Sequence, residues 1–348
     1  MNNIPNNMQN NLQNPIPNYP AYPSNYTPYP PNYPGYYVPA PKPPKTKSFW
    51  RGFSLSMAFF AMFFGGLQIF ASIYVVIAIV PQMIAGMDVN SVSGTDPSAV
   101  SSDIMNIPNI GTIAMTAQFV GWIFAIAGIL LLYKLIKVHG IKRPLFKSLE
   151  LGKIRPVTIL WSIAAGLGMS GFVNAALALL PVPDVMYEQF NDAFSMFETT
   201  PQWMLLLGIG IVGPIAEELA LRSGVFSVMR RDSNFWVAAV VSSLLFGLMH
   251  MIPLQICYAT VIGFILAVVC HLTKSVWPAI IIHIVNNSWS FMMPESTSAN
   301  VEDFLFGGGT VTWISLAIGA VLVAVSLLVI AKIEKSKQWQ ISYEMQGV

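Results

Sequence analysis

The chain has 348 residues, of which 54% are hydrophobic and 10% are charged, and its formal net charge is +2. Soluble domains carry about 25% charged residues, so this composition excludes an ordinary soluble protein and indicates a membrane protein. The small net charge is uninformative as a total, and nothing in the sequence leads us to expect a nucleic-acid partner.

Residues 1–48 form a segment rich in Pro, Tyr and Asn, with a loose repeat of the type Asn-Tyr-Pro. Proline blocks helix and sheet, and the aliphatic residues are too few to build a core. We therefore predict a disordered tail, which could also act as a ligand for a proline-reading partner. We expect no cleavable signal peptide, because this polar segment precedes the first apolar run.

Long apolar runs follow, and each is close to the roughly 20 residues that a helix needs to span a bilayer. The runs are continuous rather than alternating, which excludes a transmembrane β-barrel. We predict an all-α, polytopic domain over residues 49–348 with about eight transmembrane helices. These helices are expected at residues 54–82, 110–133, 157–181, 203–228, 235–252, 255–273, 275–293 and 310–331.

The basic residues fall on one side of these predicted spans. Apart from Arg222, every Lys and Arg lies in the tail and its flank, in residues 134–156, in the short connections after spans four and six, or after span eight. The alternate loops carry acidic charges only; they are residues 83–109, 182–202 and 294–309. This positive-inside pattern predicts that both termini are cytoplasmic.

Two carboxylates, Glu217 and Glu218, lie inside the fourth apolar run, and Arg222 follows them. An ionisable group at membrane depth is costly, so it is rarely present without a partner or a task. Glu218 and Arg222 are four residues apart on a helix and can pair. Glu217 is rotated by roughly 100° from Glu218, so it projects in another direction and requires a different partner. We therefore predict a structural Glu218–Arg222 pair that orients Glu217.

Two later spans contribute further polar groups. His250 follows Phe246 by one helical turn, so the phenyl ring could pack on the imidazole. His283 and Asn287 are also four residues apart and share one face of the seventh span. Any one of these residues could serve packing alone. Two histidines, an unpaired glutamate and an asparagine on three spans instead favour a functional site.

The residue types suit hydrolysis of an amide bond. A glutamate and a histidine can hold and deprotonate a water molecule, and a second histidine with an asparagine can donate hydrogen bonds to the developing oxyanion. No Gly-x-Ser-x-Gly nucleophile motif occurs. Alternatively, Glu217, His250 and His283 could ligate Zn²⁺ and leave a position open for water, although the helix-borne HExxH motif is absent.

These residues resemble the three ordered motifs of the CPBP family, which covers CAAX prenyl endopeptidases and the Abi-like bacteriocin-processing proteins, all intramembrane proteases. The resemblance extends over about residues 155–293, where we place the protease core. It rests on Glu217-Glu218-x-x-x-Arg222, Phe246-x-x-x-His250 and His283-x-x-x-Asn287.

The resemblance implies an eight-span fold with the site in a cavity reached from the cytoplasmic side. It implies that Glu217 and His250 activate water, while His283 and Asn287 stabilise the oxyanion. It leaves a zinc-dependent and a metal-free glutamate mechanism both open. The implied protein is an endopeptidase of the prokaryotic plasma membrane that cuts a membrane-associated or lipidated peptide or protein.

Two other functions compete with this one. In an ion- or proton-coupled transporter, Glu217, His250 and His283 would relay protons. In a non-catalytic immunity protein, the same residues would bind a peptide. Asn287 favours the protease, because an amide suits an oxyanion better than a proton relay, and no inverted repeat is evident in the sequence.

Counting along the predicted helices gives the expected depth of the site. At about 1.5 Å per residue, Glu217 and His283 fall in the inner half of the bilayer when counted from Trp203 and Trp277. Counting from the tryptophan that opens the fifth span places His250 deeper. Either the fifth span starts below the membrane surface, or its predicted boundary is wrong.

Overall fold

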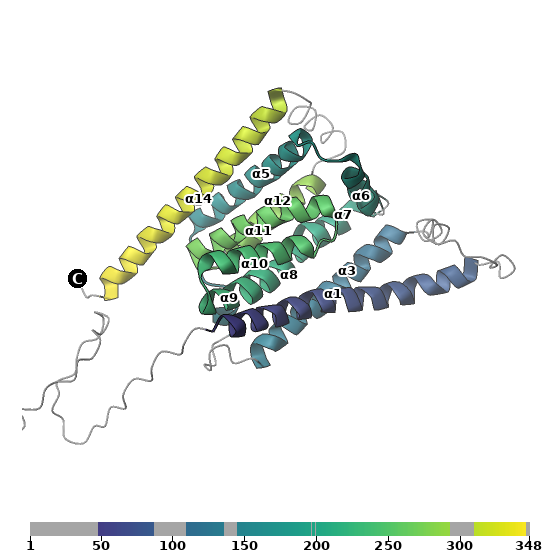
Figure 1. Cartoon of the computed structure of the whole chain (residues 1–348), viewed down its shortest axis with the longest axis horizontal. Coiled ribbons are helices and arrows are strands. Elements are labelled where there is room, and N and C mark those ends of the chain that lie inside the picture. Colours follow the sequence, from purple (N-terminus) through teal and green to yellow (C-terminus); the bar gives the residue numbers. More distant parts are fainter. Residues whose placement is uncertain are drawn as a thin grey trace, which may run out of the picture. The chain divides into compact units, whose positions relative to one another are not determined.

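The computed structural model describes residues 48–86, 109–135, 145–195, 197, 198, 200–292 and 310–345. Within these ranges every regular element is helical, which confirms the predicted all-α class (Figure 1). The predicted tail up to residue 47, the stretch 87–108 and the loop 294–309 lie outside the described residues.

Helices occupy all eight predicted spans. Six of the helices in the described part are long and apolar enough to cross a membrane, whereas the fifth and seventh spans form shorter helices. The helices that match the spans are α1 (Phe49–Gly86), α3 (Ile110–Leu135), α5 (Pro156–Leu179), a composite helix Gln202–Asp232, α10 (Phe235–Leu248), α11 (Pro253–Thr273), α12 (Trp277–Met292) and α14 (Thr310–Met345).

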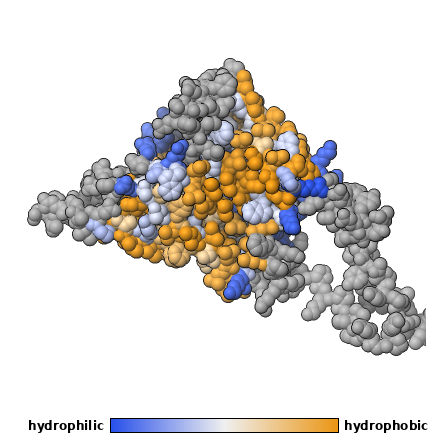
Figure 2. Space-filling view, turned by 180° about the vertical axis from the view of Figure 1, so that it is seen from behind, coloured by the Kyte–Doolittle hydropathy of each residue, from blue (hydrophilic) through white to orange (hydrophobic). Residues whose placement is uncertain are grey.

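The outer surface of this helical unit is apolar. Large side chains such as Ile77, Leu160 and Leu328 are more than half exposed. On the face seen in Figure 2, hydrophobic residues cover most of the described surface, and hydrophilic residues gather toward its edges. Such a surface is stable in lipid, where apolar side chains need no cover from water.

The composite helix Gln202–Asp232 changes its winding along its length. It consists of α7 (Gln202–Leu205), the π-helical η3 (Leu206–Val212), α8 (Gly213–Glu218), the π-helical η4 (Leu219–Phe226) and α9 (Ser227–Asp232). π-Helical turns are rare and occur frequently at functional sites. Here two of them flank α8, the segment that carries Glu217 and Glu218.

Neighbouring helices pack in pairs, and several of them contact the composite helix. α1 packs on α3, α10 on α11 and α14 on α5, and α12 contacts both α5 and η3 (Figure 1). Two glycines permit close approaches. A Cβ atom at Gly247 would lie 2.1 Å from the Thr260 Oγ1, and one at Gly166 would lie 2.7 Å from the Val285 Cβ. These contacts bring α10 onto α11 and α5 onto α12.

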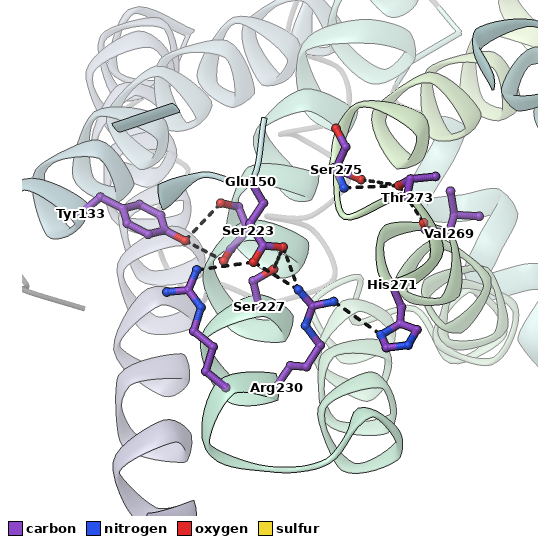
Figure 3. Close-up of polar contacts among 10 residues, drawn as sticks. Tyr133, Glu150, Ser223, Ser227, Arg230, Val269, His271, Thr273 and Ser275 are labelled. Carbon is purple, nitrogen blue, oxygen red and sulfur yellow. Dashed lines mark hydrogen bonds and ion pairs between the residues drawn. The ribbon is translucent and has the colours of Figure 1, made fainter. Parts of the chain in front are cut away.

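A polar network joins several helices at one end of the unit (Figure 3). The carboxylate of Glu150, just beyond the short α4 (Leu145–Ser148), accepts hydrogen bonds from Ser227 at 2.6 Å and from Arg230 at 3.1 Å. Arg230 also reaches His271 at the end of α11, with 3.5 Å between the ring nitrogen and the guanidinium. Burial and the charge of Arg230 lower the pKa of Lys274 just beyond α11.

Further contacts at this end involve the first helices. Arg51 at the start of α1 forms an ion pair with Asp232 at the end of α9. Tyr133 near the end of α3 donates to the Ser223 carbonyl at 2.6 Å. Segments that the positive-inside pattern assigns to one side of the membrane therefore meet at one end of the structure. Which side is cytoplasmic stays a prediction.

One helix was not predicted. Residues 182–202 were expected to form an extracytoplasmic loop, but they contain α6 (Asp184–Ser195). Its outer face carries three exposed acids four residues apart, and its other face carries two half-buried phenylalanines; the five are Asp184, Glu188, Asp192, Phe190 and Phe194. With 12 residues α6 is too short to span a membrane, so a search for long apolar runs misses it.

Candidate active site

A cavity of about 430 Å³ gathers most of the predicted site residues. His250, His283 and Asn287 all contribute to its lining, and so does Phe246. The remaining lining comes largely from α5, α6 and α11, and much of it is apolar. Segments that are far apart in the sequence thus place three polar side chains around one space.

The predicted ion pair between Glu218 and Arg222 is confirmed. A guanidinium nitrogen of Arg222 lies 3.0 Å from Glu218 Oε1, and both side chains are fully buried. Arg222 also donates to the Gly263 carbonyl at 3.1 Å, and its Cζ lies 4.5 Å from the centre of the Phe246 ring. A carboxylate, a carbonyl and an aromatic face therefore compensate the buried positive charge.

His283 lies between the two glutamates. Its Nδ1 is 2.9 Å from Glu218 Oε1, and its Nε2 is 3.8 Å from Glu217 Oε2. Because the carboxylate paired with Arg222 accepts hydrogen bonds, we assign the Nδ1 proton to His283. The partner that Glu217 lacks on its own helix is therefore His283 on α12. Sequence spacing gives no sign of this contact, since it joins separate helices.

His250 lies on a turn and not on the predicted helix 235–252. α10 ends at Leu248, and α11 begins at Pro253. The residue before a proline is restricted to extended conformations, which Ile252 adopts, and Met251 takes a left-handed φ of 60°. These two residues reverse the chain immediately after His250.

The turn fixes the protonation pattern of His250. Its Nδ1 lies 2.8 Å from the Phe246 carbonyl oxygen, which can only accept a hydrogen bond. The Nδ1 therefore carries a proton, and in the neutral ring Nε2 is left as a base.

Phe246 packs against both histidines, which the sequence predicted for His250 alone. Its ring centroid lies 5.2 Å from that of His250 and 5.4 Å from that of His283, each with an edge-to-face arrangement. The two imidazoles therefore both contact one phenyl ring. The predicted boundary of the fifth span was wrong, because α10 ends at Leu248 and the following turn carries His250.

Asn287 and its neighbour Asn286 both line the cavity. Asn287 Nδ2 donates to the Ile209 carbonyl at 3.2 Å, and Asn286 Nδ2 donates to Asn287 Oδ1 at 3.0 Å. The i,i+4 spacing from His283 identified Asn287 but gave no reason to include Asn286. Asn174 and Tyr258 are further polar lining residues that the motifs do not contain.

The residues proposed as zinc ligands do not converge as ligands do. Among the described residues, no group of three His, Cys, Asp or Glu side chains could hold a metal ion together. The Nδ1 atoms of His283 and His250 contact Glu218 and a carbonyl, as they do in many metal-binding histidines, so only the lack of convergence of the side chains argues against a zinc site. This arrangement does not fit Zn²⁺, so we route no step of the reaction through a metal.

The cavity reaches the end of the unit that carries α6, through Phe190 and Phe194. α6 belongs to a loop that the charge pattern predicts to be extracytoplasmic. The lining therefore extends toward the side opposite to the one that the resemblance implies for access. Access from the cytoplasmic side stays a prediction.

Comparisons with known proteins agree with the motifs. Residues 199–289 match the family model described as type II CAAX prenyl endopeptidase Rce1-like. The chain is also 27% identical to "Putative membrane peptidase YdiL" of Bacillus subtilis (strain 168) over 146 residues, which are 39% of this chain and 57% of that protein. No solved structure matches the chain significantly. With its apolar membrane-length helices and with all three motifs inside the matched segment, the chain is an integral membrane protein that is similar to the CPBP proteases over residues 199–289.

Proposed function

We propose that this protein is an intramembrane endopeptidase that hydrolyses a peptide bond of a membrane-associated or lipidated peptide or protein. One observation carries the proposal: His250, His283 and Asn287 line a single cavity, and the Glu217 carboxylate lies 3.8 Å from His283. The match to a type II CAAX prenyl endopeptidase model supports a hydrolase over a proton-coupled transporter.

The proposed reaction begins with a water molecule held between Glu217 and His250. The water oxygen attacks the carbonyl carbon of the scissile bond while Glu217 or His250 Nε2 takes its proton. The negative charge that develops on the carbonyl oxygen accepts hydrogen bonds from Asn287 and His283. When the tetrahedral intermediate collapses, the C–N bond breaks and the held proton passes to the leaving amine.

The contact with Glu218 sets a condition on His283. Because Nδ1–H is donated to Glu218, a neutral ring has no proton on Nε2 and cannot donate toward an oxyanion. The oxyanion role therefore requires the doubly protonated imidazolium.

Two further proposals concern the extent of the protease core and the location of the protein. We place the protease core at about residues 155–293, because α5 supplies part of the cavity wall. We place both termini in the cytoplasm on the basis of the one-sided distribution of Lys and Arg. The similarity to a Bacillus subtilis protein supports a prokaryotic plasma membrane.

The test uses purified full-length protein in lipid nanodiscs with a library of membrane-proximal peptides, with and without a chelator. Mass spectrometry would identify the cleaved bonds. We expect cleavage in both conditions for wild type and none for Glu217→Gln. Wild-type cleavage by Glu217→Gln would reject the protease mechanism, and peptide retention without cleavage would favour the immunity protein.

A further inference from the structure

Asn286 contacts the proposed oxyanion donor directly. Its Nδ2 donates to Asn287 Oδ1 at 3.0 Å, although side chains one residue apart on a helix usually diverge. Asn287 in turn donates from Nδ2 to the Ile209 carbonyl at 3.2 Å. A carbonyl oxygen can only accept, so this contact determines which end of the Asn287 amide is the NH₂ group. Its Oδ1 must then accept the Asn286 proton.

The Ile209 carbonyl is available because of the local winding of η3. In a π-helix, each carbonyl accepts from the amide five residues later. The Gly213 amide accordingly donates to the Gly208 carbonyl, so it does not serve Ile209. The residue five positions after Ile209 is Pro214, which has no N–H. The side chain of Asn287 occupies the acceptor that Pro214 leaves open.

These contacts leave one hydrogen of the Asn287 amide uncommitted. The NH₂ group has two hydrogens, and the Ile209 carbonyl takes one of them. Asn287 is a lining residue of the cavity, as are Ile209 and Asn286. The amide is thus held at both ends, which removes the rotational freedom that would otherwise weaken a donor for a transient oxyanion.

We infer that Asn286 is a positioning residue and that Pro214 is its counterpart on the composite helix: together they hold the Asn287 amide with one N–H toward the reacting carbonyl. This inference rests on the proposed protease function. It assigns Asn286 no contact with the substrate. Its effect passes through Asn287 alone.

The first test compares Asn286→Asp and Pro214→Ala with wild type in the cleavage assay. Aspartate is nearly isosteric but cannot donate to Asn287, and alanine restores an N–H that competes for the Ile209 carbonyl. Each change should lower kcat by about tenfold and leave KM unchanged, since the oriented N–H acts in the transition state. Pro156→Ala is the matched control, because its proline begins α5, where the first amides of a helix have no intrahelical acceptor.

A double-mutant cycle separates positioning from a general structural effect. In an Asn287→Ala background, Asn286→Asp and Pro214→Ala should cause no further loss of kcat. A further, independent loss would overturn the inference, as would an effect on KM alone or no effect at all. Failure of the protease function is a separate result, namely cleavage by Glu217→Gln or no cleavage by wild type.

A measurement that does not depend on catalytic activity tests the positioning role even if the protein cleaves no substrate. In protein labelled with ¹⁵N-asparagine, the side-chain amide signals of Asn287 are identified by their absence in Asn287→Ala. Both Asn286→Asp and Pro214→Ala should shift this pair of signals, and Pro156→Ala should not. Unchanged Asn287 signals in the two variants would reject the positioning role even if no substrate is cleaved.

Discussion

His283 donates from its Nδ1 to Glu218 Oε1 across 2.9 Å, although the two residues are 65 positions apart. The same oxygen accepts from Arg222 at 3.0 Å. Glu218 therefore has two tasks: it neutralises a buried guanidinium, and it turns the Nε2 of His283 toward Glu217. A carboxylate that the sequence identified as structural thus also orients a residue of the proposed site.

Arg222→Ala should destabilise the fold and lower activity. The change leaves Glu218 as a buried carboxylate without its cation, which typically costs about 3–5 kcal/mol. Folded yield and thermal unfolding in detergent measure the effect. The double variant Glu218→Gln with Arg222→Met carries no unpaired charge and should unfold at a higher temperature than Arg222→Ala. Unchanged yield and melting in Arg222→Ala would show that the pair does not stabilise the fold.

Glu217→Gln should abolish cleavage and keep the fold. The Glu217 side chain is 15% exposed and its nearest ionic contact, to His283, spans 3.8 Å, so its loss breaks no short hydrogen bond. Size-exclusion profile and melting temperature should match wild type. Glu218→Gln is the matched comparison at the adjacent position, where lower stability should accompany the lower activity. Equal melting temperatures for the two variants would contradict this division of roles.

His250→Ala and Asn287→Ala should differ in severity. Loss of the proposed base should abolish cleavage almost entirely. Loss of one oxyanion donor typically lowers the rate about 10²–10³-fold, so Asn287→Ala should retain measurable turnover. Its defect should fall on kcat and not on KM, because the hydrogen bond forms mainly in the transition state. If Asn287→Ala were folded but completely inactive, Asn287 would contribute more to catalysis than one donated hydrogen bond.

His283→Ala distinguishes the oxyanion role from a metal-ligand role. In the metal-free mechanism proposed here, the variant should resemble Asn287→Ala in kcat, and the zinc content of the protein should equal that of wild type. Steady-state kinetics and elemental analysis of the same preparations give both numbers. A loss of bound zinc together with complete inactivity would reverse the assignment.

Thiol labelling should establish the orientation in the membrane. In a background without Cys257 and Cys270, Asn191→Cys on the exposed face of α6 should react with an impermeant reagent on intact cells. Lys335→Cys, exposed near the C-terminal end of α14, should react only after lysis. The reverse pattern would place both termini outside and would overturn the positive-inside prediction.

Contacts between residues four positions apart in the sequence could be predicted, and contacts between separate helices could not. The Glu218–Arg222 pair and the packing of Phe246 on His250 follow from four-residue spacing, which α-helical geometry turns into proximity. The partner of Glu217 could not be found in this way. Its distance to His283 depends on how far α12 is shifted and rotated against α8, and no local pattern of residues encodes that offset.

The sequence by itself determined the membrane class, the positions of eight helices and the candidates for the site residues, because hydrophobic length and the cost of a buried charge act locally. Only the tertiary structure decided that His250 leaves its helix on the turn before Pro253. It also decided that α6 lines part of the cavity. It decided as well that Asn287 donates to the Ile209 carbonyl, for which Pro214 has no N–H to offer. These features arise where backbone groups and side chains from different helices compete for the same hydrogen bonds, and that competition is resolved only once the helices are packed.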